Sequence, residues 1–414
     1  MSSLPLEQLL NLPQVRVLRS QVSDQSLIIH VEMTACSTLC HRCQQPTSDF
    51  FAHGEVLHLR HLPVFERTVY LYLHTKRYLC PRCPKRATTT QRGDWYDAVA
   101  GCAKAFANSL LRALVNSTLQ DVARAHTVTY DCVRGLLQRC VSDCTDWTQV
   151  SVLRVLGLDE IALHKGRGNY VTIVSTQDES GSPVLLAVLE GRTKAVVKNF
   201  LLSIPERLRV QVKQVCSDLY EGFINAAREV LPQAKVVADR FHVAKLYRGA
   251  LEKLRQSELK RLRKGLSEEE YKGLKGVMWA LRRRAEDLSV EEQELLSKLF
   301  VLSPALREAY RLREELTKIF ESSQSLKSGQ KALQKWLDKV LGSGVTCFET
   351  FCQTLKERLV EIANYFVSRL TSGWVEGFNN KLKVIKRRCY GLGSAGSLYR
   401  RVWLDLNGRK AFAG

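Results

Sequence analysis

The pattern of hydrophobic and polar positions changes character several times along the chain. Near the N-terminus, β-branched and aromatic residues stand in or near alternation, which predicts short strands at residues 27–33, 55–62 and 68–74. From about Tyr96 to Arg139 the spacing of apolar residues becomes helical. Residues 243–370 are rich in Leu, Lys, Arg, Glu and Ala with helical spacing, which predicts a helical block.

A second group of strands lies between these two helical stretches. Apolar runs predict strands at residues 152–163, 170–177, 183–190, 212–217 and 234–239. Two helix-like segments interleave with them, at residues 193–203 and 220–231. Strands that begin as consecutive hairpins and then alternate with helices form a mixed sheet flanked by helices, so we expect the α/β fold class.

The charge of the chain indicates a polyanionic partner. Among 414 residues, 62 Lys and Arg stand against 42 Asp and Glu, which gives a formal net charge of +20. Each phosphate that such a protein neutralises releases condensed counterions, so the charge favours nucleic acid as a partner. The alternative is a merely basic cytosolic protein. The hydrophobic fraction of 45% and the charged fraction of 25% are ordinary for a folded soluble protein.

Membrane and secretory classes are not expected. No stretch approaches the ~20 apolar residues that a membrane helix needs. Residues 1–13 lack the basic start and apolar core of a signal peptide. The 13 cysteines are an odd number scattered along a long chain, which argues against a disulfide framework and for a reducing compartment. We therefore expect a cytoplasmic protein with no membrane partner.

Four of the cysteines form two C-x-x-C knuckles, at residues 40–43 and 80–83. Each knuckle places two thiolates on one tight turn, and two knuckles can close a tetrahedral zinc site that leaves no open position for chemistry. The predicted ligands of a structural Zn²⁺ are Cys40, Cys43, Cys80 and Cys83. Four free cysteines or a redox pair are the alternatives, and Cys36 and His41 are nearby alternate ligands.

Residues 117–139 match the pattern of a helix-turn-helix. Ser117 and Gln120 form a capping-box pattern that can start the first helix. Apolar or small residues fall where the motif wants them, at Val122, Ala123, Val128, Val133 and Leu136. The second helix, capped by Thr129, offers a DNA groove the side chains of Thr129, Tyr130, Arg134 and Gln138. His126 and Thr127 depart from the usual apolar residue and glycine, and an ordinary pair of bundle helices is the alternative.

Three aspartates stand on or at the ends of apolar core strands. Asp159 lies within LRVLGLDEIAL, Asp218 ends VKQVCSD, and Asp239 ends AKVVAD. A charged group in such a place costs several kcal/mol unless it is paired or bound to a metal. Any one of them is explained by a helix cap or a salt bridge, but carboxylates at the ends of adjacent strands can converge on a hard cation.

A fourth acidic residue, Glu376, lies on a basic helix. Residues 374–388 read as a helix capped by Ser372, and one face carries Glu376, Asn380, Lys383 and Arg387. On this face the carboxylate can complete a metal site while Lys383 and Arg387 meet DNA phosphate; a solvated charged face is the alternative. Because two cations about 4 Å apart suit phosphodiester chemistry, we expect Mg²⁺ (or Mn²⁺) to be held by the catalytic residues Asp159, Asp218 and Glu376.

The chain resembles bacterial insertion-sequence transposases that carry a DDE triad, specifically the ISL-three type. The resemblance covers nearly the whole chain and includes the paired C-x-x-C module and the helix-turn-helix. Its further motifs are Gly157-Leu158-Asp159-Glu160 with Lys165-Gly166 and Tyr170, Ser217-Asp218, and the stretches 237–243 (VADRFHV), 375–381 (VEGFNNK) and 386–391 (KRRCYG). The motifs at 237–243 and at 375–391 are long and specific, whereas the zinc and helix-turn-helix signals alone are generic.

The resemblance implies a ribonuclease-H-like core interrupted by a helical insertion. Its first strand would carry Asp159 and its fourth would end at Asp218. Asp239 and His242 look like the D-x-x-H motif of related transposases, in which they would be accessory residues that support the site or handle DNA. Trp279 and Trp336, within the insertion, would either stack on an extruded base or belong to the core.

These expectations give four domains and a function. The domains are a zinc-binding domain with short strands (1–95), a helix-turn-helix domain (96–148), the ribonuclease-H-like catalytic domain (149–242 and 371–414) and the helical insertion (243–370). The expected function is that of a transposase that binds double-stranded terminal inverted repeats, cleaves the ends and joins them to target DNA as a nucleoid-associated homodimer or higher homo-oligomer. A non-catalytic DNA-binding regulator and a nuclease of the same fold are the alternatives.

Overall fold

The computed structural model describes residues 6–84, 86–163, 169–368 and 373–413, which divide into two compact units. The first unit comprises Met1–Asp143, Ile385–Tyr390 and Arg400–Gly414, and the second comprises Cys144–Val384 and Gly391–Tyr399. Helices α17 (Gly373–Arg388) and α18 (Ala395–Ala411) therefore contribute residues to both units. Within the described ranges no helix is long and apolar enough to cross a membrane.

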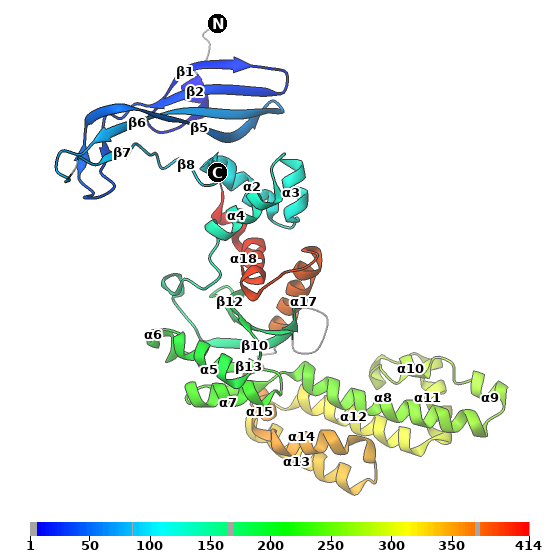
Figure 1. Ribbon diagram of the computed structural model, residues 1–414. Coiled ribbons are helices and arrows are strands. Elements are labelled where there is room, and N and C mark those ends of the chain that lie inside the picture. The colour runs from blue at the N-terminus through cyan, green and yellow to red at the C-terminus, as the bar shows by residue number, and fades with distance from the viewer. Residues whose placement is uncertain (1–5, 85, 164–168, 369–372, 414) are drawn as a thin grey trace. The chain divides into compact units, whose positions relative to one another are not determined.

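The first unit is built on a seven-stranded sheet with the order β1-β2-β6-β5-β9-β8, in which β7 also pairs with β6 (Figure 1). The strands are β1 (Val15–Val22), β2 (Ser26–Met33), β5 (Asp49–Val64), β6 (Arg67–Leu79), β7 (Thr88–Thr90), β8 (Tyr96–Asp97) and β9 (Cys102–Ala103). The predicted strands 27–33, 55–62 and 68–74 lie inside β2, β5 and β6. Strand β1 was not predicted. It is a largely exposed edge strand, so its sequence has little of the apolar alternation that predicts a strand.

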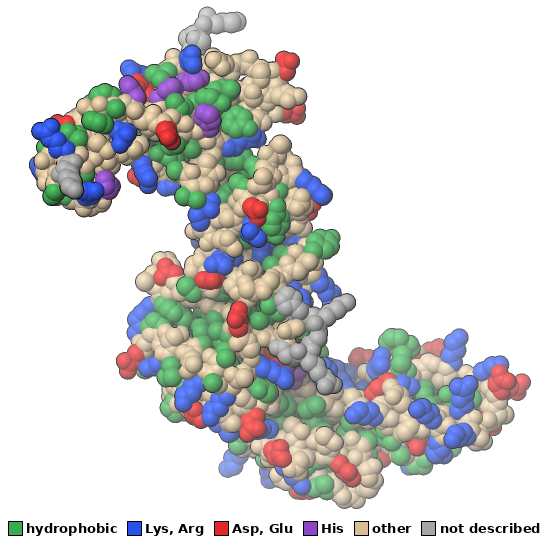
Figure 2. Space-filling model, in the orientation of Figure 1, with side chains coloured by type: hydrophobic (Ala, Val, Ile, Leu, Met, Phe, Trp, Pro, Cys, Tyr) green, Lys and Arg blue, Asp and Glu red, His purple; other side chains and the backbone are tan. Residues whose placement is uncertain are grey.

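Alternate residues of the central strand β6 point into the hydrophobic core on one face of this sheet. Val69, Leu71 and Leu73 are each at most 1% exposed, whereas their neighbours are half-buried. On the strands, several histidines gather (purple in Figure 2): His30 Nδ1 lies 3.0 Å from His74 Nε2, and the ring of His58 stacks on Tyr72.

Three helices follow the sheet: α2 (Lys104–Leu114), α3 (Leu119–Ala125) and α4 (Tyr130–Cys140). Their apolar faces form one core, with Phe106, Leu110 and Leu136 buried against one another and against Leu404 of α18. The expectation of helix from Tyr96 is wrong for its first residues, because β8 and β9 complete the sheet before α2 begins.

The second unit contains a five-stranded mixed sheet with the order β12-β11-β10-β13-β14. Strands β10 (Val155–Ala162), β11 (Tyr170–Gln177) and β12 (Pro183–Glu190) pair antiparallel, and β13 (Gln214–Ser217) and β14 (Lys235–Ala238) continue the sheet in parallel from β10. The predicted α/β class with a mixed sheet is confirmed. The five predicted strands are all present, and the ends of three of them are shorter than predicted.

Each face of this sheet is covered by helices. On one face Leu156, Leu158 and Val215 form a core with α5 (Lys194–Ser203), α6 (Glu206–Arg209) and α7 (Glu221–Val230). On the other face Cys216 and Val237 share a core with the long helical segment and with α17. The alternation of side chains along each short parallel strand thus supplies both faces.

The predicted helical block is confirmed, and it begins earlier than residue 243. Helix α8 (Arg240–Gly265) starts directly after β14, and Asp239 is its N-cap. The further helices are α9 (Glu268–Lys272), α10 (Val277–Ala280), α11 (Val290–Leu302), α12 (Pro304–Ser322), α13 (Leu326–Gly342), α14 (Glu349–Glu357), α15 (Leu359–Ala363) and α16 (Tyr365–Ser368). Trp336 is buried and its Nε1 donates to the carbonyl oxygen of Leu312, so it is a core residue, whereas Trp279 is 62% exposed.

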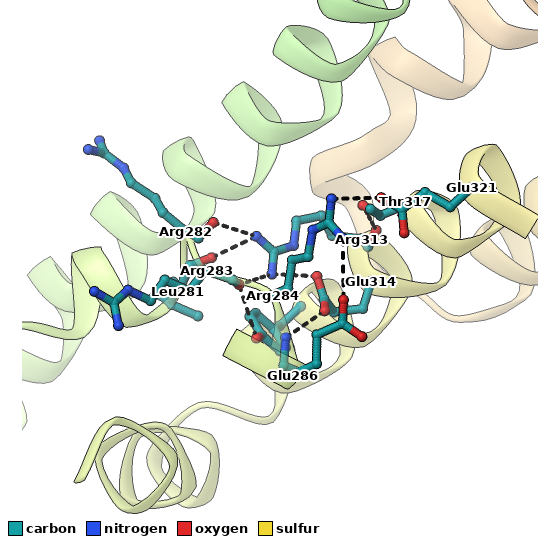
Figure 3. A network of polar contacts seen from close by, with 11 residues as sticks. Leu281, Arg282, Arg283, Arg284, Glu286, Arg313, Glu314, Thr317 and Glu321 are labelled. Atoms are coloured by element: carbon teal, nitrogen blue, oxygen red, sulfur yellow. Dashed lines mark hydrogen bonds and ion pairs between the residues drawn. The ribbon is translucent and has the colours of Figure 1, made fainter. Parts of the chain in front are cut away.

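A buried arginine joins two parts of this helical block (Figure 3). The guanidinium of Arg313, on α12, donates hydrogen bonds to the carbonyl oxygens of Leu281, Arg282 and Arg283, which follow α10. It also pairs with the carboxylate of Glu314 at 2.7 Å. Because these carbonyls end a helix and lack intrahelical partners, Arg313 satisfies them and fixes the turn against α12.

Candidate active site and cysteine cluster

The three predicted aspartates form a row across adjacent parallel strands. Leu158 of β10 is in register with Ser217 of β13, and Ser217 is in register with Ala238 of β14. Asp159, Asp218 and Asp239 each follow one of these paired residues. The parallel pairing therefore brings to one edge of the sheet three carboxylates that are far apart in the sequence.

Helix α17 packs against β10 beside this row. A side-chain carbon at Gly157 would lie 2.9 Å from atoms of both Trp374 and Val375, so the glycine permits the close approach of the helix. One turn later, the buried Asn379 donates a hydrogen bond from Nδ2 to Oδ2 of Asp159. Oδ1 of Asp159 accepts the backbone N–H of Glu160 at 2.7 Å.

Asp239 and His242 form a second pair next to Asp159 and Asp218. Asp239 is 5% exposed, and its Oδ1 accepts the backbone N–H of Phe241 at 2.7 Å as the cap of α8. Its Oδ2 lies 3.1 Å from Nδ1 of His242. Both carboxylate oxygens of Asp239 therefore already have partners within the chain.

Burial and mutual charge shift the pKa values of Asp159, Asp218 and His242. Burial raises the pKa of Asp218 to about 6, and the charge of Asp159 adds to this effect. Burial also raises the pKa of Asp159, which the charges of His242 and Lys383 oppose. The hydrogen bond with Asp239 and the charges of the other two aspartates raise the pKa of His242. Without a bound cation, the carboxylates are held where their charged form is disfavoured.

Glu376 lies in the first turn of α17, half-buried, one turn before Asn379 and two turns before Lys383. Among the described residues it makes no hydrogen bond or ion pair. Asn380, Lys383 and Arg387 are exposed on α17, as the predicted shared face requires. The predictions for Ser372, Lys165 and Gly166 concern residues outside the described ranges.

The structure does not gather the carboxylates into a tight ligand set. Across the described ranges, the only group of three or more acidic, His or Cys residues whose ligand atoms all lie within 4.8 Å of one another is the cysteine quartet. The ligand oxygens of Asp159, Asp218 and Glu376 therefore do not all lie within 4.8 Å of one another. Oxygen ligands from separate elements can close on a cation as it binds.

Sequence reasoning missed two features at this site. Asn379 could have been noticed as a polar residue at a core-facing position between Phe378 and Leu382. Glu160 accepts two hydrogen bonds from Arg192, at 2.8 and 3.0 Å. The Arg192 guanidinium also lies over the rings of Tyr170 and Tyr220, and no local pattern predicts this cluster because its members come from four segments.

The two C-x-x-C knuckles meet in the first unit. Cys40 and Cys43 lie on the turn between β3 (Thr38–Leu39) and β4 (Pro46–Thr47), and the second knuckle lies between β6 and β7. The Sγ atoms of Cys40 and Cys83 are 3.8 Å apart, and those of Cys43 and Cys80 are 3.6 Å apart. Four thiolates at 2.3 Å from a tetrahedral zinc would be about 3.8 Å apart, so the quartet fits this ion.

The alternate zinc ligands do not join the quartet. The ring of His41 contacts the hydroxyl of Thr89 at 3.0 Å, and Cys36 is exposed. Backbone N–H groups of Cys43 and Arg42 lower the pKa of Cys40 to about 6, which favours the thiolate that a metal requires. Burial and the neighbouring sulfurs raise the pKa of Cys83 to about 12, a conflict that a dication would relieve.

Helices α3 and α4 lie where the sequence predicts a helix-turn-helix. Thr129 caps α4 by accepting the N–H of Cys132, as predicted, and Thr129, Tyr130, Arg134 and Gln138 are exposed. The predicted cap at Ser117 is wrong: Thr118 caps α3 by accepting the N–H of Asp121, so the helix starts one residue later. Thr127, where glycine is usual, has a φ of +52°, the left-handed conformation that glycine favours.

Known transposases resemble the chain over most of its length. A family model for transposases of the ISL-three type matches residues 156–402. The chain is 29% identical over 372 residues to the transposase for insertion sequence element IS1001 of Bordetella parapertussis, covering 89% of this chain and 88% of that protein. It is 25% identical over 391 residues to the transposase for insertion sequence element IS1557 of Mycobacterium tuberculosis, covering 90% and 86%. Because the family model spans more than half of the sequence, the chain belongs to the ISL-three-type transposases.

Proposed function

We propose that this transposase binds the terminal inverted repeats of its element, cleaves DNA at the ends and joins them to target DNA with divalent metal ions. The observation that carries the proposal is the row of Asp159, Asp218 and Asp239 on β10, β13 and β14, with α17 packed against β10. The first strand of the mixed sheet bears Asp159, and Asp218 directly follows the fourth, which supports the ribonuclease-H-like core that is part of this proposal. The expected domain boundaries, with the helical insertion at 243–370, are part of this proposal.

Asp159, Asp218 and Glu376 are the residues that would hold two Mg²⁺ or Mn²⁺ ions. Carboxylate oxygens are the ligands that hard cations prefer, and the raised pKa values of Asp159 and Asp218 indicate a site that a positive charge would stabilise. When bound, such ions activate a water or a 3′-hydroxyl and stabilise the leaving oxygen. Asn379 orients Asp159, and Lys383 supplies positive charge beside it for the scissile phosphate.

Asp239 and His242 would act as accessory residues. Asp239 already accepts hydrogen bonds on both oxygens, which leaves it less free than Asp159 and Asp218 to bind a metal. His242, oriented by Asp239, would contact a phosphate next to the bond that is cut.

The first unit would recognise the ends of the element. In this proposal α3 and α4 form a helix-turn-helix whose second helix presents Thr129, Tyr130, Arg134 and Gln138 to the major groove. A structural Zn²⁺ on the cysteine quartet would stabilise the adjoining sheet, and Arg387 would contact phosphate. Because two ends must be brought together, the active form would be a homodimer or a larger homo-oligomer.

The test is an assay of cleavage and joining on a labelled duplex that carries the inverted repeats flanking the gene. With Mg²⁺, the wild type should cut at the end and join the new 3′ end to a target plasmid, whereas Glu376→Gln should do neither and still bind the duplex. The matched control is Glu268→Gln, which removes an exposed carboxylate paired with Lys272 on α9. Cutting without joining would indicate a nuclease, and full activity of Glu376→Gln would remove Glu376 from the metal site.

A further inference from the structure

The side chain of Arg192, just before α5, is held in place by residues from three other segments of the second unit. Its Nη1 donates to both carboxylate oxygens of Glu160 on β10, at 2.8 and 3.0 Å. Its Cζ lies 4.8 Å from the ring centre of Tyr170 and 5.1 Å from that of Tyr220. A guanidinium that contacts two aromatic rings and a carboxylate has little rotamer freedom left, so its orientation is set before any ligand arrives.

The contact between Arg192 and Glu160 leaves one edge of the guanidinium unused. In an ion pair between arginine and a carboxylate, two nitrogens frequently donate in parallel to the two oxygens. Here the single atom Nη1 donates to both oxygens. Within the described ranges, Nε and Nη2 of Arg192 have no hydrogen-bond partner, and the side chain is 43% exposed. These two nitrogens present parallel N–H donors, which match two oxygens of a phosphate.

The residues that hold Arg192 also donate hydrogen bonds to the two candidate catalytic aspartates. The backbone N–H of Glu160 donates to Oδ1 of Asp159 at 2.7 Å. The backbone N–H of Tyr220 donates to Oδ1 of Asp218 at 2.9 Å. The unused donors of Arg192 therefore lie at the same edge of the sheet as the aspartates.

Arg192 and Lys383 lie on opposite faces of this sheet. Side chains alternate along β10, so that Leu158 packs with α5 and α7 whereas Gly157 meets α17 (Figure 1). Glu160 shares the face of Leu158, which places Arg192 on the side of α5 and α7. Lys383 is on α17. The two cations thus flank the row of aspartates from the two sides of the sheet.

We propose that Nε and Nη2 of Arg192 bind a DNA phosphate near the scissile phosphate, on the side of it away from Lys383. This inference rests on the proposed function, because that function brings the scissile phosphate to Asp159 and Asp218. A DNA strand that crosses the sheet edge from α17 toward α5 passes Arg192 after it passes the aspartates. Because Glu160 and the tyrosine rings already orient the guanidinium, binding the phosphate costs little conformational entropy. The contact fixes the position of the strand and reads no base.

The experiment replaces single phosphates around the cleavage site with methylphosphonate, which is uncharged, in a set of duplexes that carry the end of the element. Single-turnover cleavage of each duplex by the full-length protein is measured with Mg²⁺. Arg192→Ala should cut the unmodified duplex about 10- to 100-fold more slowly than the wild type, the effect of losing charge-assisted hydrogen bonds. At one position a methylphosphonate should slow the wild type by a similar factor and should slow Arg192→Ala no further.

Lys198→Ala is the matched control for this experiment. Lys198 is also a cation of α5, its side chain is 44% exposed, and it pairs with Glu229. Lys198→Ala removes the same charge, and it should respond to every methylphosphonate as the wild type does.

Arg192→Lys separates loss of the phosphate contact from loss of the fold. It keeps a cation beside Glu160 and Tyr220 but lacks the paired donors of a guanidinium. Its melting temperature should stay close to that of the wild type, and its response to the methylphosphonate at the Arg192 position should be mostly lost.

The proposal would be overturned if every methylphosphonate slowed Arg192→Ala and Arg192→Lys by the same factor as the wild type, whatever their rates on the unmodified duplex. Arg192 would then only position Asp159 and Asp218 through Glu160 and Tyr220. Cleavage of the unmodified duplex by Arg192→Ala at the wild-type rate would also overturn it. A failure of the proposed function is a different result, because the wild type itself would then leave the unmodified duplex uncut.

Discussion

The side-chain amide of Asn379 donates a hydrogen bond to the carboxylate of Asp159, although 220 residues separate them in the sequence. Asn379 is 1% exposed, and its Oδ1 has no partner among the described residues. A buried polar atom without a hydrogen-bond partner lowers the free energy of unfolding, so Oδ1 of Asn379 destabilises the fold. The contact links α17, which carries Glu376, to the strand that carries Asp159.

We expect Asn379→Ala to reduce cleavage by about 10- to 100-fold, the usual effect of removing a residue that orients a metal ligand. The neighbouring Asn380 is exposed on the same helix, so Asn380→Ala should retain nearly full activity. The measurement is the rate of end cleavage over a range of Mg²⁺ concentrations. Asn379→Ala should need more Mg²⁺ for half-maximal rate, and an unchanged Mg²⁺ requirement would contradict the role in positioning Asp159.

The raised pKa of Asp218 gives a stability prediction with a definite sign. In the metal-free folded state this pKa is about 6, whereas an unfolded carboxyl titrates near 3.8. Folding therefore carries no penalty from Asp218 below pH about 4; the penalty grows as the pH rises and is complete above pH about 6, where it reaches about 2–3 kcal/mol. Asp218→Asn should raise the melting temperature at pH 8 by several degrees without added divalent cation, and hardly at pH 4.

Asp178→Asn is the matched control for this measurement. Asp178 accepts hydrogen bonds from Ser180 and Ser182, which lower its pKa, so its substitution should not stabilise the protein at pH 8. If Asp218→Asn fails to stabilise the protein at pH 8, or stabilises it equally at both pH values, then burial does not strain the charged form of Asp218.

Asp239→Asn separates an accessory role from a role in binding the catalytic metals. Because its two oxygens are occupied by the Phe241 N–H and by His242, we expect the variant to bind Mn²⁺ at the active site almost as well as the wild type. Cleavage should fall about tenfold or more, since His242 loses its partner. Mn²⁺ binding can be followed by electron paramagnetic resonance, and its disappearance would place Asp239 among the metal ligands.

Removing one cysteine of the quartet should release the structural metal. Purified wild-type protein should contain about one zinc ion per chain by mass spectrometry, and Cys80→Ser should lose most of it together with specific binding to the ends. Cys36→Ser is the control, because Cys36 is exposed and outside the cluster. Equal zinc contents in the two variants would exclude the quartet as the site.

The sequence predicted the strands of the second sheet well because each is an apolar run bounded by turn residues. It also placed Asp159 on a strand and Asp218 and Asp239 at strand ends, and parallel register alone is enough to align them. The position of Glu376 relative to them could not be predicted in this way. Its distance depends on how α17 packs over Gly157, which is a tertiary contact between segments far apart in the sequence.

Other differences between the predictions and the structure have separate causes. Thr118 rather than Ser117 caps α3, because both residues can accept the same kind of hydrogen bond and only the backbone geometry selects one. Thr127 takes the left-handed conformation despite its β-branched side chain. At this position the residue type departs from the helix-turn-helix pattern, but the backbone has the conformation that the usual glycine would adopt. The cluster of Arg192 with Glu160, Tyr170 and Tyr220 is assembled only by folding.

The central claim is that Asp159 belongs to the metal site that breaks DNA. The most direct measurement is end cleavage with Mg²⁺ by Asp159→Asn, run beside the wild type with binding to the same duplex measured in parallel. A bound cation supplies several kcal/mol of transition-state stabilisation, so cleavage should fall about a thousandfold while affinity for the ends is unchanged. Cleavage at the wild-type rate by Asp159→Asn would contradict the account.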